Sequence, residues 1–125
     1  MASVPDDPVS VPPLANTHAR TRSCGAFTVV EAAGEIDLST ADLLAEHLSA
    51  ATTGPGPDVL VDLRRVSFLD CSGLRVLCRA ESRARERQGR LRLVSTDPRV
   101  RRLLGGVGLS HRFPLLPGVP GEQRG

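Results

Sequence analysis

The chain of 125 residues carries a net charge of +2, and only 2% of its residues are aromatic. This length suits one domain, and the scarcity of aromatic rings argues against a surface that stacks on nucleic-acid bases or sugars. The three cysteines have spacings that match no zinc site, and no apolar stretch approaches the roughly 18 residues of a membrane span. These features predict a cytoplasmic protein with reduced thiols, without a metal or cofactor site and without a membrane segment.

Hydrophobic periodicity and turn residues predict strands and helices that alternate along the chain. In order, they are an edge strand at 17–23, a strand at 27–33, a helix at 40–51, a strand at 59–63, a helix at 72–88, a strand at 91–94, a helix from 98 to about 104 and a short edge strand at 113–116. This order predicts an α/β domain at 17–116, with a mostly parallel sheet of four or five strands and crossover helices. The flanking residues 1–16 and 117–125 are predicted to be flexible tails.

Capping side chains mark the starts of two of the predicted helices. Ser39 and Asp42 have the spacing of a capping box at the start of the first helix. Asp97 followed by Pro98 combines a capping side chain with proline at the first helical position of the last helix.

The stretch from residue 58 to residue 77 is the centre of the chain. An apolar strand leads into Asp70, Cys71, Ser72 and Gly73, and an amphipathic pattern follows, so we expect the Ser72 hydroxyl in or beside the first turn of a helix. Backbone N–H groups and the helix dipole favour negative charge there, which would suit a phosphate on this serine. The same placement also suits a plain N-cap serine.

Asp37 and Asp70 both follow predicted strands, and each has two interpretations. Such aspartates commonly cap a loop or a helix N-terminus. They would also lie at the carboxyl ends of strands, where ligands and partners gather in open α/β sheets.

The motifs of common enzyme classes are missing from the sequence. There is no G-x-S-x-G elbow, no P-loop, no H-E-x-x-H and no G-x-G-x-x-G. Ser72 could act as a nucleophile only beside a general base, and nothing in the sequence brings His18, His47 or His111 to it. A small Ser–His hydrolase is therefore a minor alternative.

The second predicted helix and its exit, residues 75–92, carry seven arginines against two glutamates. A solvated helix face is the simplest interpretation, a docking surface for an acidic protein is a second, and a nucleic-acid surface is a third. Cys71 at the start of this helix could be a redox sensor, but without a resolving cysteine close in sequence an inert thiol is simpler.

Three segments together resemble a known family. The run V-x-F-L-D-C-S-G-L at 66–74 is similar to the signature of STAS domains, and specifically of the bacterial anti-sigma factor antagonists. G-E-I-D at 34–37 resembles the motif after the second strand of this family, and residues 98–109 resemble its third helix and the following turn. The resemblance covers about 17–116.

The resemblance implies a mixed five-stranded sheet and a switch by partner exchange. In the family, the unmodified protein binds an anti-sigma factor that is also a serine kinase of the histidine-kinase-like ATPase type, and a sigma factor is freed. The kinase phosphorylates the serine that matches Ser72, the complex dissociates, and a PP2C-type phosphatase resets the protein. The implied partner and kinase contacts are Asp37, Ser39, Asp70, Cys71, Gly73, Leu74 and Arg75.

Two departures from the family pattern bear on this expectation. Cys71 stands where the family more usually has serine or threonine, which removes a second phosphorylatable hydroxyl beside Ser72. The chain ends soon after the last predicted strand, so we expect the C-terminal helix of the family to be absent or much shortened.

A phosphate on Ser72 would add about −1.5 to −2 charges near two aspartates, and the helix N-terminus is expected to hold it.

Alternatives remain beside this leading interpretation. The same fold could serve as a scaffold subunit of a stress-sensing assembly. An arginine-rich domain that binds RNA or DNA directly is less favoured, because no recognised binding motif is present.

Overall fold

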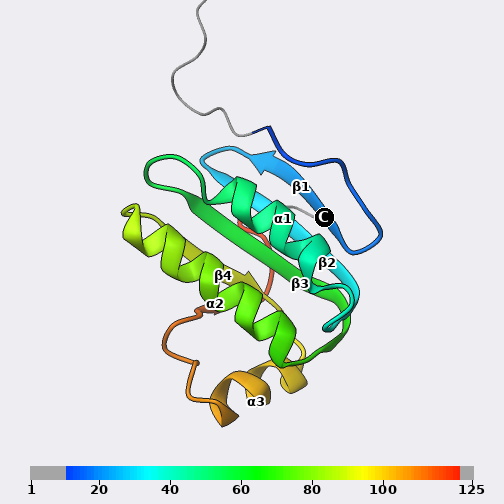
Figure 1. Ribbon diagram of the computed structural model, residues 1–125. Helices are drawn as coiled ribbons and strands as arrows, with labels where there is room; N and C mark the ends of the chain where they lie inside the picture. The colour runs from blue at the N-terminus through cyan, green and yellow to red at the C-terminus, as the bar shows by residue number, and fades with distance from the viewer. Residues whose placement is uncertain (1–10, 122–125) are drawn as a thin grey trace, which may run out of the picture.

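The three-dimensional structure is a computed structural model, and it describes residues 11–121. Within this range five strands and three helices alternate after an initial hairpin (Figure 1). The elements in chain order are β1 (Ala19–Cys24), β2 (Phe27–Ile36), α1 (Ala41–Ala51), β3 (Asp58–Leu69), α2 (Cys71–Glu86), β4 (Arg90–Val94), α3 (Pro98–Gly106) and β5 (Leu115–Leu116). The predicted α/β class and the predicted order of elements are confirmed.

The five strands form one sheet in the order β1-β2-β3-β4-β5. β1 is antiparallel to β2, and the remaining pairs are parallel. Residues 59–63 of the central strand β3 are all buried, as expected for a parallel strand covered on both faces. β3 is longer than predicted and continues through two arginines to Leu69, because its second half still pairs with β2.

Helices α1 and α2 cover one face of the sheet, and α3 lies at its end, close to the start of α2 (Figure 1). Right-handed crossovers between successive neighbouring strands place their helices on the same side of a sheet, which explains this arrangement. The main core lies between these layers and includes Leu44 and Leu48 of α1, Leu77 of α2 and Val61 of β3, none of which is exposed. Leu104 extends this core into α3.

The opposite face of the sheet carries a small apolar cluster. Val29, Leu60 and Val94 pack there with Val119 of the C-terminal segment, which is only 4% exposed. The first residues of the predicted tail at 117–125 therefore run over the sheet. Residues 122–125, and residues 1–10 of the other predicted tail, lie outside the described range.

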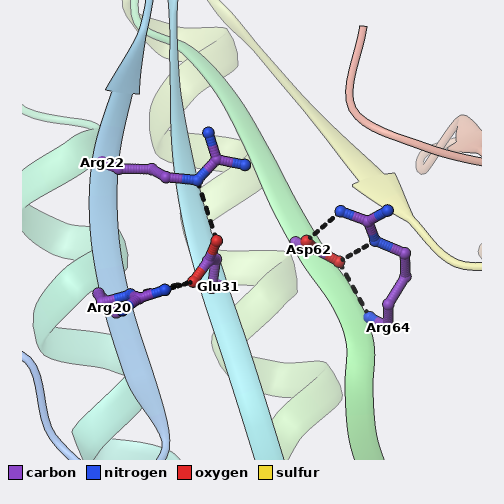
Figure 2. Close-up of polar contacts among 5 residues, drawn as sticks. All are labelled: Arg20, Arg22, Glu31, Asp62 and Arg64. Carbon is purple, nitrogen blue, oxygen red and sulfur yellow. Dashed lines mark hydrogen bonds and ion pairs between the residues drawn. The ribbon is translucent and has the colours of Figure 1, made fainter. Parts of the chain in front are cut away.

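Two carboxylates and three arginines lie beside this cluster on the same face of the sheet (Figure 2). Glu31 accepts hydrogen bonds from Arg20 at 2.8 Å and Arg22 at 2.9 Å, and Asp62 accepts two from the Arg64 guanidinium at 2.8 and 3.0 Å. Burial raises the pKa of each carboxyl, but the hydrogen bonds and charges of the arginines outweigh burial and leave both pKa values below their usual range. Both side chains are therefore charged near neutral pH.

The segment before β1 is attached to α1 and to its own strand. His47 of α1 is fully buried, with Nδ1 2.6 Å from the Thr21 hydroxyl and Nε2 3.2 Å from the Leu14 carbonyl oxygen. The Asn16 side-chain oxygen accepts the backbone N–H groups of His18 and Ala19 at 2.7 and 2.8 Å. These bonds hold residues 14–19 against the body of the domain.

The start of α1 differs from the predicted capping box. Thr40 is the N-cap residue and its side chain makes no capping hydrogen bond, while the Ser39 hydroxyl donates to Asp37 rather than reaching into the helix. The capping-box prediction for Ser39 and Asp42 is therefore wrong. The Asp37 carbonyl instead accepts the N–H groups of Thr40 and Ala41 at 3.1 and 2.8 Å, so the turn itself satisfies the first donors. At α3 the predicted cap is confirmed, because Asp97 accepts the N–H of Arg99 at 2.8 Å and Pro98 opens the helix.

Candidate functional site

Two loops meet where the parallel strands β2 and β3 end. The backbone N–H of Asp70 donates to the Ile36 carbonyl oxygen at 3.2 Å, which joins the residue before Asp37 to the residue before α2. The carboxyl edge of a parallel sheet is the usual place for ligand and partner sites in open α/β folds. The structure thus brings Asp37 and Asp70 to one edge, as expected from the sequence.

Gly73 makes this close approach possible. A Cβ at this position would lie 2.4 Å from Leu69 Cδ1, closer than real Cβ atoms come, and 3.2 Å from the Ile36 carbonyl oxygen, which is tighter than most such contacts. Glycine therefore lets the first turn of α2 rest on the end of β2 without displacing the Leu69 side chain. Gly73 and Leu74 are both buried, so they hold the site in place from beneath.

Asp70 is the N-cap residue of α2. Its Oδ1 accepts the backbone N–H of Ser72 at 2.8 Å and that of Gly73 at 3.2 Å. Ser72 is consequently not an N-cap serine, and that alternative is wrong. The N–H groups that were expected to hold a phosphate already donate to the Asp70 carboxylate. A phosphate on Ser72 would therefore need a different partner, such as a cationic side chain.

Ser72 itself lies in the first turn of α2 and is partly exposed. Its hydroxyl makes no hydrogen bond to any residue in 11–121, which leaves the oxygen available for chemistry from outside. Cys71 beside it is exposed, and so is Arg75 one turn further along the helix. These three side chains thus lie together at the N-terminal end of α2.

Asp37 organises the second loop through its carboxylate. Its Oδ1 accepts the Ser39 hydroxyl at 2.8 Å, the Ser39 N–H at 3.0 Å and the Thr40 hydroxyl at 3.2 Å. The hydrogen bond from the Ser39 side chain is the main cause that lowers the pKa of Asp37 below its usual value. Asp37 therefore presents a fixed negative charge next to the start of α2.

Two exposed apolar side chains near this edge were not singled out from the sequence. Leu38, between Asp37 and Ser39, is 82% exposed, and Phe68, near the end of β3, is 53% exposed. Phe68 also lines a cavity of about 230 Å³ between the end of β3 and α3, together with Val66, Ser67, Leu69, Asp97, Arg99, Val100 and Leu103. For Leu38, its position between two polar loop residues was a sequence feature that could have indicated an exposed apolar side chain.

Two of the three histidines that could serve a hydrolase as general base are engaged away from Ser72. His47 bonds to Thr21 and Leu14, and His18 Nδ1 lies 2.9 Å from the Ala33 carbonyl oxygen. Among residues 11–121 no three metal-ligating side chains cluster, and none of the helices there is long and apolar enough to cross a bilayer.

The family described as Mlab, STAS domain matches residues 19–117 of the chain. The chain belongs to the STAS domain family. A Mycobacterium tuberculosis protein provisionally named an anti-anti-sigma factor is similar to this STAS protein, with 36% identity over 110 residues that cover 86% of this chain and 74% of that protein. The anti-sigma-B factor antagonist of Listeria monocytogenes is 37% identical over 93 residues, which cover 74% of this chain and 81% of that protein.

A solved structure leads to the same family. The crystal structure of an anti-sigma factor antagonist from Mycobacterium paratuberculosis matches this STAS protein with a TM-score of 0.72 and 30% identity, over 81% of this chain and 86% of that chain. The family resemblance seen in residues 34–37, 66–74 and 98–109 is thereby confirmed. The Mycobacterium and Listeria relatives all carry names of the anti-sigma factor antagonist class.

Proposed function

We propose that this STAS protein is a cytoplasmic anti-sigma factor antagonist, a regulator rather than an enzyme, whose switch is phosphorylation of Ser72. In the unmodified state it binds an anti-sigma factor that is also a serine kinase with the histidine-kinase-like ATPase fold, and a sigma factor is freed. Phosphorylation of Ser72 releases the protein, and a PP2C-type phosphatase restores it. The names of the relatives support a role as an anti-sigma factor antagonist. The position and exposure of Ser72 support its role as the phosphorylated residue.

The exposure of Ser72 is the observation that carries the proposal. Ser72 is partly exposed at the carboxyl edge of the sheet, in the first turn of a capped helix, and its hydroxyl makes no hydrogen bond to residues 11–121. A kinase can reach such an oxygen without unfolding the domain.

The surrounding surface suits a protein partner. Asp37, Ser39, Cys71 and Arg75 supply polar and exposed contacts around Ser72. Leu38 and Phe68 add the apolar area that the centre of a protein interface needs.

The charges of the site explain how phosphate would cause release. A phosphoserine carries about −1.5 to −2 charges near neutral pH. Those charges would appear between the Asp70 carboxylate, which already occupies the helix N–H groups, and the ionised Asp37. A partner packed over this point would meet like charges and would have to desolvate them, at a cost on the order of several kcal/mol.

The test uses the serine-kinase anti-sigma factor of the same organism with ATP, followed by mass spectrometry of the antagonist. We expect one phosphate, on Ser72. Ser72→Ala should bind the kinase and stay bound in ATP, and Ser72→Asp should bind poorly. Ser49→Ala is the matched control, because it removes an exposed serine hydroxyl of α1 outside the site and should still be phosphorylated on Ser72. Phosphate on Ser39 alone, or release of Ser72→Ala by ATP, would overturn the assignment.

A further inference from the structure

The exposed face of α2 carries a row of arginines in line with Ser72. Arg75, Arg79 and Arg83, here called the arginine stripe, follow Ser72 at intervals of three, seven and eleven residues, which places all four residues on one face of the helix. At 1.5 Å per residue the stripe is about 12 Å long. An open hollow runs along it, lined by the three arginines with Cys78, Ser82 and Glu86.

The stripe differs from most other arginines of the chain in its lack of carboxylate partners. Within residues 11–121, eight arginines form ion pairs, namely Arg20, Arg22, Arg64, Arg85, Arg90, Arg92, Arg99 and Arg112. No carboxylate of that range forms an ion pair with a stripe arginine. Arg83 donates a hydrogen bond from Nε to the Thr52 hydroxyl at 2.8 Å. The positive charges of Arg75 and Arg79 thus have no carboxylate partner among residues 11–121.

We infer that the arginine stripe is a docking surface for an acidic segment of the anti-sigma factor, with carboxylates of the partner on Arg75 and Arg79. Guanidinium groups bind carboxylates in a two-pronged geometry, so unpaired arginines in a row favour a partner with acidic side chains at a matching spacing. This inference rests on the proposed function and adds the chemistry of the partner to it.

A nucleic acid fits the same surface less well. The whole chain has a net charge of only +2, Glu86 lies within the hollow, and Asp37 and Asp70 lie at the Ser72 end of the stripe. Phosphate backbones would meet these carboxylates, and no aromatic residue lines the hollow to stack on bases.

The position of Ser72 at the head of the stripe links docking to the switch. Residues three apart on a helix have Cβ atoms about 5–6 Å apart, so a phosphate on Ser72 lies within reach of Arg75. Because Asp70 already occupies the nearby N–H groups, Arg75 is the cation of α2 best placed to pair with that phosphate. The phosphoserine would therefore take Arg75 from the carboxylate of the partner and add repulsion at the same point.

The experiment measures the Kd of the purified serine-kinase anti-sigma factor for the full-length protein, without ATP, at about 0.05 and 0.5 M salt. Arg75→Glu/Arg79→Glu reverses two stripe charges. Arg101→Glu/Arg102→Glu is the matched control, because it makes the same change in net charge at exposed positions of α3. Circular dichroism verifies that both variants are folded.

We expect the stripe variant to lose about tenfold or more in affinity at low salt, with a smaller loss at high salt. The control should change the Kd by less than about threefold, since isolated surface charges contribute little. Equal losses of affinity in both variants, or no loss in the stripe variant, would overturn the docking role of the arginine stripe while leaving the proposed function intact. A wild-type protein that never binds the anti-sigma factor would overturn both proposals. If a double-stranded DNA fragment binds the wild type and not the stripe variant, the partner is a nucleic acid and the inference is wrong.

Discussion

The Oδ1 atom of Asp70 lies 2.8 Å from the backbone nitrogen of Ser72 and accepts its hydrogen bond. This contact makes Asp70 a structural cap as well as a charge beside the proposed phosphorylation site. Asp70→Ala should lower the free energy of unfolding by about 0.5–2 kcal/mol, because two N–H groups of α2 lose their acceptor. Asp70→Asn keeps an oxygen at the cap and should lose much less. Urea denaturation measures both, and equal losses would show that the cap is not the cause.

A side chain at Gly73 should destabilise the fold. Gly73→Ala would bring a methyl group within 2.4 Å of Leu69 Cδ1 and 3.2 Å of the Ile36 carbonyl oxygen, and we expect a loss of about 1–3 kcal/mol in unfolding free energy. Gly105→Ala in α3 is the control, since its methyl would meet only the Ser110 hydroxyl at 3.7 Å. That variant should be neutral or more stable by up to about 1 kcal/mol. The prediction fails if both variants unfold at a lower temperature than the wild type, or both at a higher temperature.

Acid should destabilise the protein through the carboxylates of Figure 2. Glu31 and Asp62 have lowered pKa values in the folded chain. Such groups stabilise the fold fully above their unfolded pKa, near 4, and this stabilisation is lost as the pH falls through the folded pKa. The unfolding free energy of the wild type should therefore fall as the pH drops from about 5 toward 3. Glu31→Gln/Asp62→Asn should be less stable at pH 7 and should show a shallower fall, and an unchanged slope would contradict the assignment.

His47 should anchor the segment before β1. His47→Leu keeps an apolar side chain in the core but removes the bonds to Thr21 and Leu14, each worth about 0.5–1.5 kcal/mol. Amide hydrogen exchange should speed up at residues 16–19 more than in β3. Glu46→Leu, at an exposed position one residue earlier on α1, is the control and should leave that exchange unchanged. Uniform acceleration across the whole sheet would indicate general destabilisation instead.

The sequence predicted the features that depend on local pattern. Apolar runs located β2, β4 and the buried first half of β3, Asp97 and Pro98 located the start of α3, and the D-C-S-G run placed Ser72 in the first turn of α2. These signals are read over a few neighbouring residues, so the remainder of the fold does not alter them.

The sequence did not predict the contacts that depend on how the chain folds in three dimensions. The capping-box spacing paired Ser39 with Asp42. The turn after β2 instead brings the Ser39 hydroxyl to Asp37, and this turn could not be predicted from the spacing. Glu81 makes the i, i+4 ion pair with Arg85 that is typical of a helix, at 3.4 Å, but its shorter contact is with Arg112 at 2.6 Å, 31 residues away. The exposure of Leu38 and Phe68 likewise follows from tertiary packing rather than from periodicity.

The bond between Asp70 and Ile36, with Gly73 seated beneath, has a kinetic consequence. Both loops are fixed to the ends of neighbouring strands, so a partner meets a preorganised surface and loses little conformational entropy in ordering it. Little backbone movement is then available to transmit a covalent change. The modified and unmodified proteins should share one backbone conformation, and the added charge should slow the encounter with an acidic partner as well as shorten the residence time of the complex.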